Sequence, residues 1–243
     1  MVEWNIIHID ETDSTNQWIT SHGDKSPCEG KPTVVWADYQ TAGRGCGTNR
    51  WESERGKNLL FSMLVYPHQL PANRQFRISE VVSVALCETL EPYMNNQVEI
   101  KWPNDIYVDG RKICGILVEN RLYGGLVKAC VIGIGLNVNQ EVFLSDAPNP
   151  VSLYQLTGRT FDREAVLHDF LRRFESVSSM ETLCSQYRNR LFLRQKQSVF
   201  KDQNGLFRAT IEDVEADGHL VMRDEAGRER RYAFKEVSFM IKN

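Results

Sequence analysis

The sequence predicts an α/β (α+β) protein in two parts: a mixed sheet flanked by helices, followed by a small all-β unit. Between residues 2 and 180, apolar runs with strand character alternate with stretches whose apolar residues recur at helical spacing. From about residue 197, only short β-like runs remain, separated by Asn204-Gly205, Asp217-Gly218 and Ala226-Gly227. We therefore predict a first domain over residues 1–193 and a second over residues 194–243.

Local patterns predict the elements of the first domain in order. Residues 2–9 predict a strand, and the Asp-Ser-Thr-Asn run at 13–16 offers N-cap side chains for a short helix through residues 18 and 19. Residues 34–36 and 59–65 are apolar runs typical of buried strands. Apolar residues recur at helical spacing from Ile78 to Tyr93 and again from Val166 to Val177, which predicts two amphipathic helices.

The remaining strand-like segments contain turn and glycine signals. Residues 98–118 predict strands joined by a turn at Asp109-Gly110. Residues 127–138 predict a strand that contains Gly133 and Gly135, and glycines inside a strand indicate close approach of a ligand or another backbone. In the second domain, runs at 198–201, 207–214, 219–223 and 231–234 predict a small antiparallel barrel or sheet.

Composition excludes several classes of protein. The chain has 243 residues, of which 42% are hydrophobic and 25% charged, as in a soluble globular protein. A net charge of -3 argues against a dedicated nucleic-acid-binding protein, which normally carries a positively charged surface. The first residues lack a basic region followed by an apolar one, and no apolar run approaches the roughly 20 residues of a membrane helix. We expect a cytoplasmic protein that binds neither DNA nor a membrane.

The six cysteines form no C-x-x-C pair and have no histidine at ligand spacing, which argues against a zinc site. Scattered cysteines in a chain without a signal sequence indicate reduced thiols. Cys114 and Cys130 lie in apolar strands and are expected in the core.

Two motifs carry charge next to turn residues. Lys101-Trp102-Pro103-Asn104-Asp105 is followed by Lys112 and then by Gly-Ile-Leu-Val-Glu at 115–119. The two lysines could meet phosphate oxygens, and Asp105 could orient a lysine or help to hold a metal ion. Upstream, residues 40–47 form a glycine-rich segment with Arg44, where backbone can approach an anion.

Each feature also has a purely structural interpretation. Ser14 alone is better explained as a helix cap, and Gly43 and Gly45 alone as a plain loop. Lys101 could be a solvated surface lysine, and Trp102 a packing residue. No chemistry is assigned to the five histidines. However, these residues belong to five sequence blocks, and a purely structural interpretation would have to hold for all five blocks at once.

The five blocks are residues 13–16, 40–45, 101–105, 112 with 115–119, and Gly133-Ile134-Gly135-Leu136-Asn137. In this order they resemble the biotin protein ligases, and the chain looks like the short form that lacks an N-terminal DNA-binding domain. The resemblance covers roughly residues 2–139 by motif. It implies a catalytic domain followed by a small SH3-like barrel, and the activity of a biotin–[acetyl-CoA-carboxylase] ligase.

Such an enzyme joins biotin to ATP with release of pyrophosphate, and then passes biotin to a lysine of a carrier protein. Two anions meet in the first step, so cationic side chains and Mg²⁺ must neutralise the developing charge. The resemblance places Lys112 between the biotin carboxyl and the α-phosphate, and Arg44 on a loop over the adenylate. Asp105 either accepts the proton of the attacking amine or orients Lys112.

The resemblance implies the following sets of site residues. The catalytic residues would be Arg44, Lys112 and Asp105. Biotin would contact Ser14, Thr15, Asn16, Gln40, Arg44, Gly45, Cys46, Lys112 and Gly115. ATP would contact Arg44, Trp51, Lys101, Asn104, Lys112 and Asn137, and Mg²⁺ would be held by Asp105 and Asn137. The expected partner is a biotin carboxyl carrier protein or domain, and the chain is expected to be a monomer or homodimer.

One departure from the family concerns the glycine-rich segment. After Gly45 the family usually continues with further arginine, whereas this chain has Cys46 and Gly47 and its next arginine is Arg50. Either the loop closes less tightly over the intermediate or Arg50 replaces the missing charge.

Two other functions stay open at this stage. A lipoate ligase or acyltransferase of the related fold would accept a more linear, apolar acyl chain. A biotin-binding regulator without catalytic activity would need a helix-turn-helix arm, and none precedes the motif at Ser14.

Overall fold

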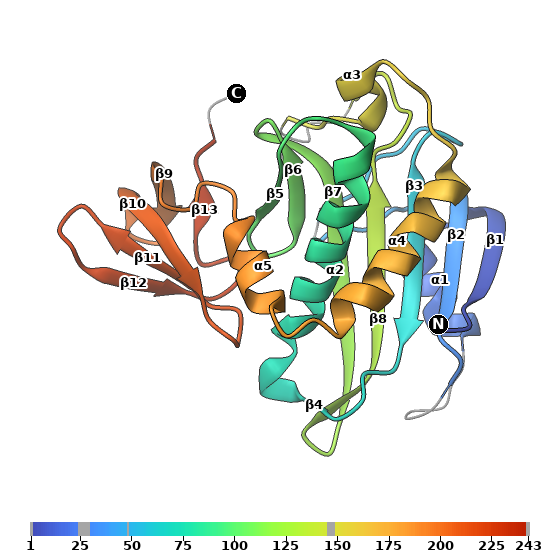
Figure 1. Cartoon of the computed structure of the whole chain (residues 1–243), viewed down its shortest axis with the longest axis horizontal. Helices are drawn as coiled ribbons and strands as arrows, with labels where there is room; N and C mark the ends of the chain where they lie inside the picture. The colour runs from blue at the N-terminus through green and yellow to red at the C-terminus, as the bar shows by residue number, and fades with distance from the viewer. Residues whose placement is uncertain (1, 24–29, 48, 145–148, 242–243) are drawn as a thin grey trace.

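The computed structural model describes residues 2–23, 30–47, 49–144 and 149–241. Figure 1 shows a large sheet with helices packed against it and a smaller sheet beside it. None of the described helices is long and apolar enough to cross a membrane.

The large sheet has eight strands and is mixed. Seven of them follow the order β1-β2-β3-β8-β7-β6-β5, and the short β4 pairs with β8. β1 and β2 are parallel, while the other neighbouring pairs are antiparallel. The strands are β1 (Asn5–Thr12), β2 (Thr33–Gln40), β3 (Leu59–Val65), β4 (Leu70–Pro71), β5 (Val98–Lys101), β6 (Asp105–Val108), β7 (Arg111–Tyr123) and β8 (Leu126–Leu136).

Helices cover both faces of this sheet. α2 (Phe76–Leu90), which continues into the 3-10 helix η2 (Glu91–Tyr93), packs with α4 (Arg163–Ser178) and α5 (Leu183–Asn189) on one face. α1 (Thr15–His22) packs against β2, β3 and β8 on the opposite face. Two short elements, η1 (Ala72–Arg74) and α3 (Leu153–Thr157), complete the helical part.

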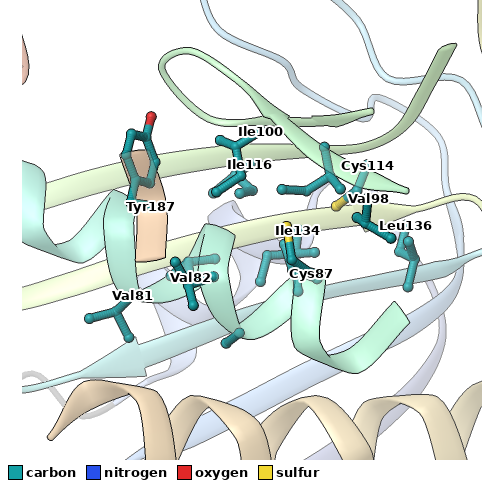
Figure 2. Close-up of a cluster of buried hydrophobic side chains, with 14 of the residues drawn as sticks. Val81, Val82, Cys87, Val98, Ile100, Cys114, Ile116, Ile134, Leu136 and Tyr187 are labelled. Carbon is teal, nitrogen blue, oxygen red and sulfur yellow. The ribbon is translucent and has the colours of Figure 1, made fainter. Parts of the chain in front are cut away.

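Side-chain alternation along the strands explains the two faces. In β8, Ile132, Ile134 and Leu136 belong to the main core under α2 and α4. Figure 2 shows Ile134 and Leu136 close to Cys87 of α2. Because successive strand residues point to opposite faces, Gly133 and Gly135 face away from this core. These two glycines therefore face the side of the sheet that carries α1.

The second domain is an antiparallel sheet, as the strand pattern predicted, and in the described residues it does not close into the SH3-like barrel that the resemblance implied. Its five strands follow the order β12-β11-β10-β9-β13. Among the described residues, the edge strands β12 and β13 do not pair with each other, and β13 has only two residues. The strands are β9 (Gln197–Asp202), β10 (Gly205–Val214), β11 (Leu220–Asp224), β12 (Glu229–Tyr232) and β13 (Ser238–Phe239).

Most predicted elements are present, with shifts of a few residues at their ends. The turn at Asp109-Gly110 is confirmed, since both residues have positive φ, of 51° and 72°. Short elements such as α3, α5 and β13 were not predicted. Cys114 and Cys130 lie in the core, and the described cysteines are free thiols, whereas Cys28 lies outside the described residues.

Candidate active site

A cavity of about 440 Å³ lies on the face of the large sheet that carries α1. Its base includes Gly115 of β7 and Gly133 and Gly135 of β8. The start of α1, the loop after β2, the turn between β5 and β6 and the last strand of the C-terminal sheet surround it. Segments from the whole length of the chain thus meet at one site.

The three glycines at the base let larger side chains approach the sheet. A Cβ on Gly133 would lie 2.2 Å from Oδ1 of Asn16. A Cβ on Gly135 would lie 2.4 Å from the Trp51 indole, and one on Gly115 would lie 2.8 Å from it. At Gly133 and Gly135 we predicted close approach of a ligand or another backbone, whereas the groups that approach in the structure are side chains of α1 and of the loop after β2.

Neutral polar side chains are linked at the end of the cavity above β3 and β8. Gln40 Oε1 accepts hydrogen bonds from Thr15 N and Thr15 Oγ1 at 2.8 and 3.0 Å. Ser62 Oγ lies 2.7 Å from Thr15 Oγ1 and donates to Asn16 Oδ1 at 2.6 Å. Asn16 Nδ2 donates to Glu119 Oε2 at 2.7 Å. Each group is oriented by a neighbour, so this end presents donors and acceptors in fixed positions.

Ser14 also faces this cavity. It occupies the N-cap position of α1, but its side chain makes no capping hydrogen bond. The simpler explanation of Ser14 as a helix cap is therefore wrong. Asp13 Oδ1 accepts from the Ser14 backbone N–H at 2.7 Å and holds the start of the helix instead.

Two further residues of this network, Ser62 and Glu119, were not predicted to have a role in the site. Ser62 is completely buried in the middle of the apolar strand β3. A hydroxyl inside an apolar strand was the available signal, because a buried polar group needs a partner. Glu119 ends the Gly-Ile-Leu-Val-Glu motif and lies between Asn16 Nδ2 and Arg44, whose Nη2 is 4.0 Å from its Oε1.

Cationic side chains gather at the other end, over β7, β6 and β5. Lys101 and Asp105 lie opposite each other across the tight turn that joins β5 to β6. Lys112 of β7 reaches this turn, and its Nζ is 2.7 Å from Asp105 Oδ1. Asn104 Nδ2 donates to the Ile116 carbonyl at 2.7 Å and ties the turn to β7.

Lys101 is not a solvated surface lysine. Its Nζ lies 5.4 Å from the Tyr107 ring centroid and 5.1 Å from that of Phe239 in the C-terminal sheet. Burial lowers the pKa of Lys101, Asp105 acts to raise it, and the like charge of Lys112 lowers it further. The amine is therefore less strongly solvated than a surface lysine and gains more from a nearby anion.

Positively charged residues far outnumber negatively charged ones in the lining of the cavity. Five are cationic, namely Arg44, Arg50, Lys101, Lys112 and Lys235, and one, Asp105, is acidic. The chain as a whole carries a net charge of -3. Among the described residues, Arg50, Lys101 and Lys235 form no ion pair with a carboxylate, so they are available to an anionic ligand.

The glycine-rich loop (residues 40–51) folds back on itself over the cavity. Arg44 and Arg50 face each other in an antiparallel bridge, Gly45 N donates to Asn49 O at 2.8 Å, and Trp51 N donates to Gly43 O at 2.9 Å. Cys46 also lines the cavity. Thr48 lies outside the described residues. Arg50 thus faces the same space as Arg44.

Trp51 occupies the centre of the base. Its indole lies on Gly115 and Gly135, and Lys112 Nζ is 5.7 Å from its ring centroid. The buried indole Nε1 has no hydrogen-bond partner among the described residues. A ring without a polar partner on this loop can be displaced without breaking a hydrogen bond.

Asn137 is the one predicted site residue that does not line the cavity. It is buried just after β8, and its Nδ2 donates to the Val151 carbonyl at 3.0 Å. Its Oδ1 has no hydrogen-bond partner among the described residues. Asp105 faces the cavity, so the two residues predicted to hold a metal ion are not both in its lining.

The C-terminal sheet contributes five residues to the cavity, which sequence analysis did not predict: Phe234, Lys235, Val237, Ser238 and Phe239. Trp102 fixes the contact, because its Nε1 donates to the Gly218 carbonyl at 2.9 Å and its ring meets that of Phe234 edge to face at 6.3 Å. The packing role considered for Trp102 is therefore correct. The sequence held no periodic signal for a contact between segments this far apart.

Comparisons with known proteins agree with this geometry. The model of the biotin/lipoate A/B protein ligase family matches residues 9–137. The chain is 34% identical over 176 residues to the bifunctional ligase/repressor BirA of Bacillus subtilis, covering 70% of this chain and 53% of that protein. It is 28% identical over 171 residues to the biotin--[acetyl-CoA-carboxylase] ligase of Mycobacterium tuberculosis, covering 69% and 62%.

The chain spans about half the length of the first curated relatives it matches, which are ligase/repressors. Among solved structures, it is similar to the biotin protein ligase from Aquifex aeolicus in complex with biotin and ATP. The TM-score is 0.78 at 25% identity, and the match covers 96% of this chain and 97% of that one. Because the family model matches more than half of the sequence, the chain belongs to the biotin/lipoate A/B protein ligase family.

Proposed function

We propose that this chain is an ATP-dependent biotin–protein ligase. The observation that carries the proposal is the polarity of the cavity, with hydrogen-bonded neutral groups at one end, Lys101 and Lys112 at the other, and three further cations in the lining. Biotin has a neutral ureido ring at one end and a carboxylate at the other, so it fits this polarity. The triphosphate of ATP would extend the negative charge into the cationic end.

In the first step, a carboxylate oxygen of biotin attacks the α-phosphate of ATP. A new P–O bond forms, the bond to the β-phosphate bridge breaks, and pyrophosphate leaves. We assign Lys112, at the cationic end, to the point where the attacking carboxylate and the α-phosphate would meet. Its ion pair with Asp105 fixes the ammonium in place, which supports an orienting role for Asp105.

The donor chemistry at the site fits Mg²⁺ in part. Asp105 offers a hard carboxylate oxygen inside the cavity, and the unpartnered Oδ1 of Asn137 is chemically suitable but lies outside the lining. Asp105 would therefore be the main protein ligand. The ion would neutralise phosphate charge alongside the lysines.

In the second step, a neutral lysine amine of the carrier protein attacks the carbonyl carbon of biotinyl-adenylate. An amide bond forms, the bond between the carbonyl carbon and the AMP oxygen breaks, AMP leaves, and the nitrogen loses one proton to the solvent. The anhydride is already activated, so no nucleophile on the enzyme is needed. What the enzyme must do is hold the adenylate and exclude water, which the glycine-rich loop can do by covering it.

The test is to incubate the protein with ATP, Mg²⁺, biotin and a biotin carboxyl carrier domain. We expect a mass gain of one biotinyl group on one lysine of the carrier, and none on a carrier whose acceptor lysine is replaced by arginine. ATP–pyrophosphate exchange that depends on biotin and not on lipoate would separate this activity from that of a lipoate ligase. Exchange supported by lipoate alone would refute the assignment.

A further inference from the structure

Lys235 lies at the tip of a turn that carries the C-terminal sheet to the rim of the cavity. Glu236 N donates to the Ala233 carbonyl at 3.2 Å, and the Glu236 carboxylate accepts from Ala233 N at 2.7 Å. The turn is held against the main domain because Phe234 packs on Trp102. The position of Lys235 is therefore fixed by its neighbours.

The backbone of Lys235 is unusual for a residue with a side chain. Its φ is +71°, in the left-handed region that favours glycine. Its ammonium lies over Gly47 of the glycine-rich loop, which also has a φ of +71°, and a Cβ on Gly47 would be 2.7 Å from Lys235 Nζ. Lys235 is an exposed residue, and its left-handed backbone and its approach to the loop hold the ammonium at the rim of the cavity.

The order of the strands places Lys235 relative to the other cations. The neutral polar groups lie over β3 and β8, Lys112 lies on the neighbouring β7, and Lys101 lies on the edge strand β5. The C-terminal sheet lies beyond β5, since Lys101 contacts the Phe239 ring. Lys235 lies in the turn between β12 and β13 of that sheet, so it approaches the cavity from the β5 side.

We propose that Lys235 binds the β- and γ-phosphates of ATP, which leave as pyrophosphate. The proposal rests on the proposed function and adds a residue from the C-terminal sheet to the site. If the carboxylate and α-phosphate meet at Lys112, the two terminal phosphates extend past Lys101 towards Lys235. An ammonium without a carboxylate partner among the described residues gains a charge-assisted contact there.

This assignment differs from a role in holding the glycine-rich loop closed. A ligand to the terminal phosphates affects ATP and pyrophosphate, but not biotin or the adenylate, which lack them. A residue that only holds the loop affects retention of the adenylate as well. The two roles therefore predict different kinetics for the same variant.

The test uses Lys235→Gly, which removes the ammonium and suits the left-handed backbone, and Lys235→Arg, which keeps the charge. Arg208→Ala is the matched control, because it removes an exposed cation from β10 of the same sheet and lies outside the cavity. We expect Lys235→Gly to raise the KM for ATP and the inhibition constant for pyrophosphate about tenfold or more. The KM for biotin and the release rate of biotinyl-adenylate should stay within about twofold of wild type, as should every constant for Arg208→Ala.

An unchanged KM for ATP in Lys235→Gly, with an active wild type, would overturn the proposal. Faster adenylate release without a change in the KM for ATP would also overturn it, because Lys235 would then act on the loop. Partial recovery of ATP affinity in Lys235→Arg would support a charge contact. A wild-type protein without biotin-dependent exchange would instead refute the proposed function, so the two failures are distinguishable.

Discussion

Replacing Gly133 by alanine should damage the polar end of the cavity selectively. The new Cβ would lie 2.2 Å from Oδ1 and 2.9 Å from Cγ of Asn16. To restore ordinary contact the Asn16 side chain must retreat by about 1 Å. Gly133 is in the middle of β8, paired on both sides by β3 and β7, so the backbone cannot move away instead.

The expected loss of stability follows from the hydrogen bonds that Asn16 makes. Its Oδ1 accepts from Ser62 at 2.6 Å, and its Nδ2 donates to the Glu119 carboxylate at 2.7 Å. A shift of about 1 Å lengthens both beyond hydrogen-bonding range. One neutral and one charge-assisted bond are together worth about 2–4 kcal/mol. Gly133→Ala should lower the free energy of unfolding by this amount and weaken biotin binding.

Chemical denaturation and calorimetric titration with biotin measure the two effects. Asn16→Ala provides the control background, since it removes the atoms that clash. In the Asn16→Ala background, Gly133→Ala should lower the free energy of unfolding only slightly. The coupling energy from the double-mutant cycle should therefore be about as large as the loss caused by Gly133→Ala in the wild type. An equal loss in both backgrounds, or normal stability and biotin affinity in Gly133→Ala alone, would show that the contact is not the cause.

Three further predictions concern charge. Lys112→Ala should reduce biotin-dependent pyrophosphate exchange by roughly 10²–10³-fold with a normal melting curve, and normal exchange would exclude its role at the α-phosphate. Because Arg50 lines the cavity beside Cys46, Arg50→Ala should speed release of biotinyl-adenylate by roughly one to two decades and Cys46→Arg should change it little; the reverse pattern would mean that the loop lacks a cation. Burial acts to raise the pKa of Asp224, but hydrogen bonds from Arg228 and Arg230 outweigh it and hold the pKa at about 2. This folded-state pKa lies below the ordinary 3.8, so the carboxylate stabilises the C-terminal sheet above about pH 4 and the contribution is lost as the pH falls towards 2. Asp224→Asn should therefore lower the melting temperature at pH 7 but hardly at pH 2, and an equal loss at both would contradict this.

The parts of the site that local sequence could predict are those built within one turn or motif. Lys101 and Asp105 face each other because the three residues between them form a tight turn, and Lys112 is close because β6 and β7 are joined by the Asp109-Gly110 turn. Such geometry follows from neighbouring residues. The motif order that resembles biotin protein ligases therefore marked the cationic end well.

Other parts depend on contacts between distant segments, for which the sequence holds no periodic signal. Ser62 was hidden in an apolar strand, and its partners Thr15 and Asn16 are 47 and 46 positions away. Asn137 follows a glycine-containing motif but points into the interior, towards Val151. The strand pattern of the C-terminal part left a barrel and an open sheet as alternatives, because strand spacing does not reveal whether the edge strands pair.

We predicted a domain boundary between residues 193 and 194. The turn between β5 and β6, in the first of these domains, packs against the second. Lys101 and Asp105, at its two ends, line the cavity, while Trp102 between them is 3% exposed and holds the C-terminal sheet through Gly218 and Phe234. The same turn thus sets both the cationic end of the cavity and the position of Lys235. A change that weakens docking of the C-terminal sheet would also uncover Lys101, whose ammonium lies near the Phe239 ring. The C-terminal sheet is for this reason part of the cationic end of the cavity.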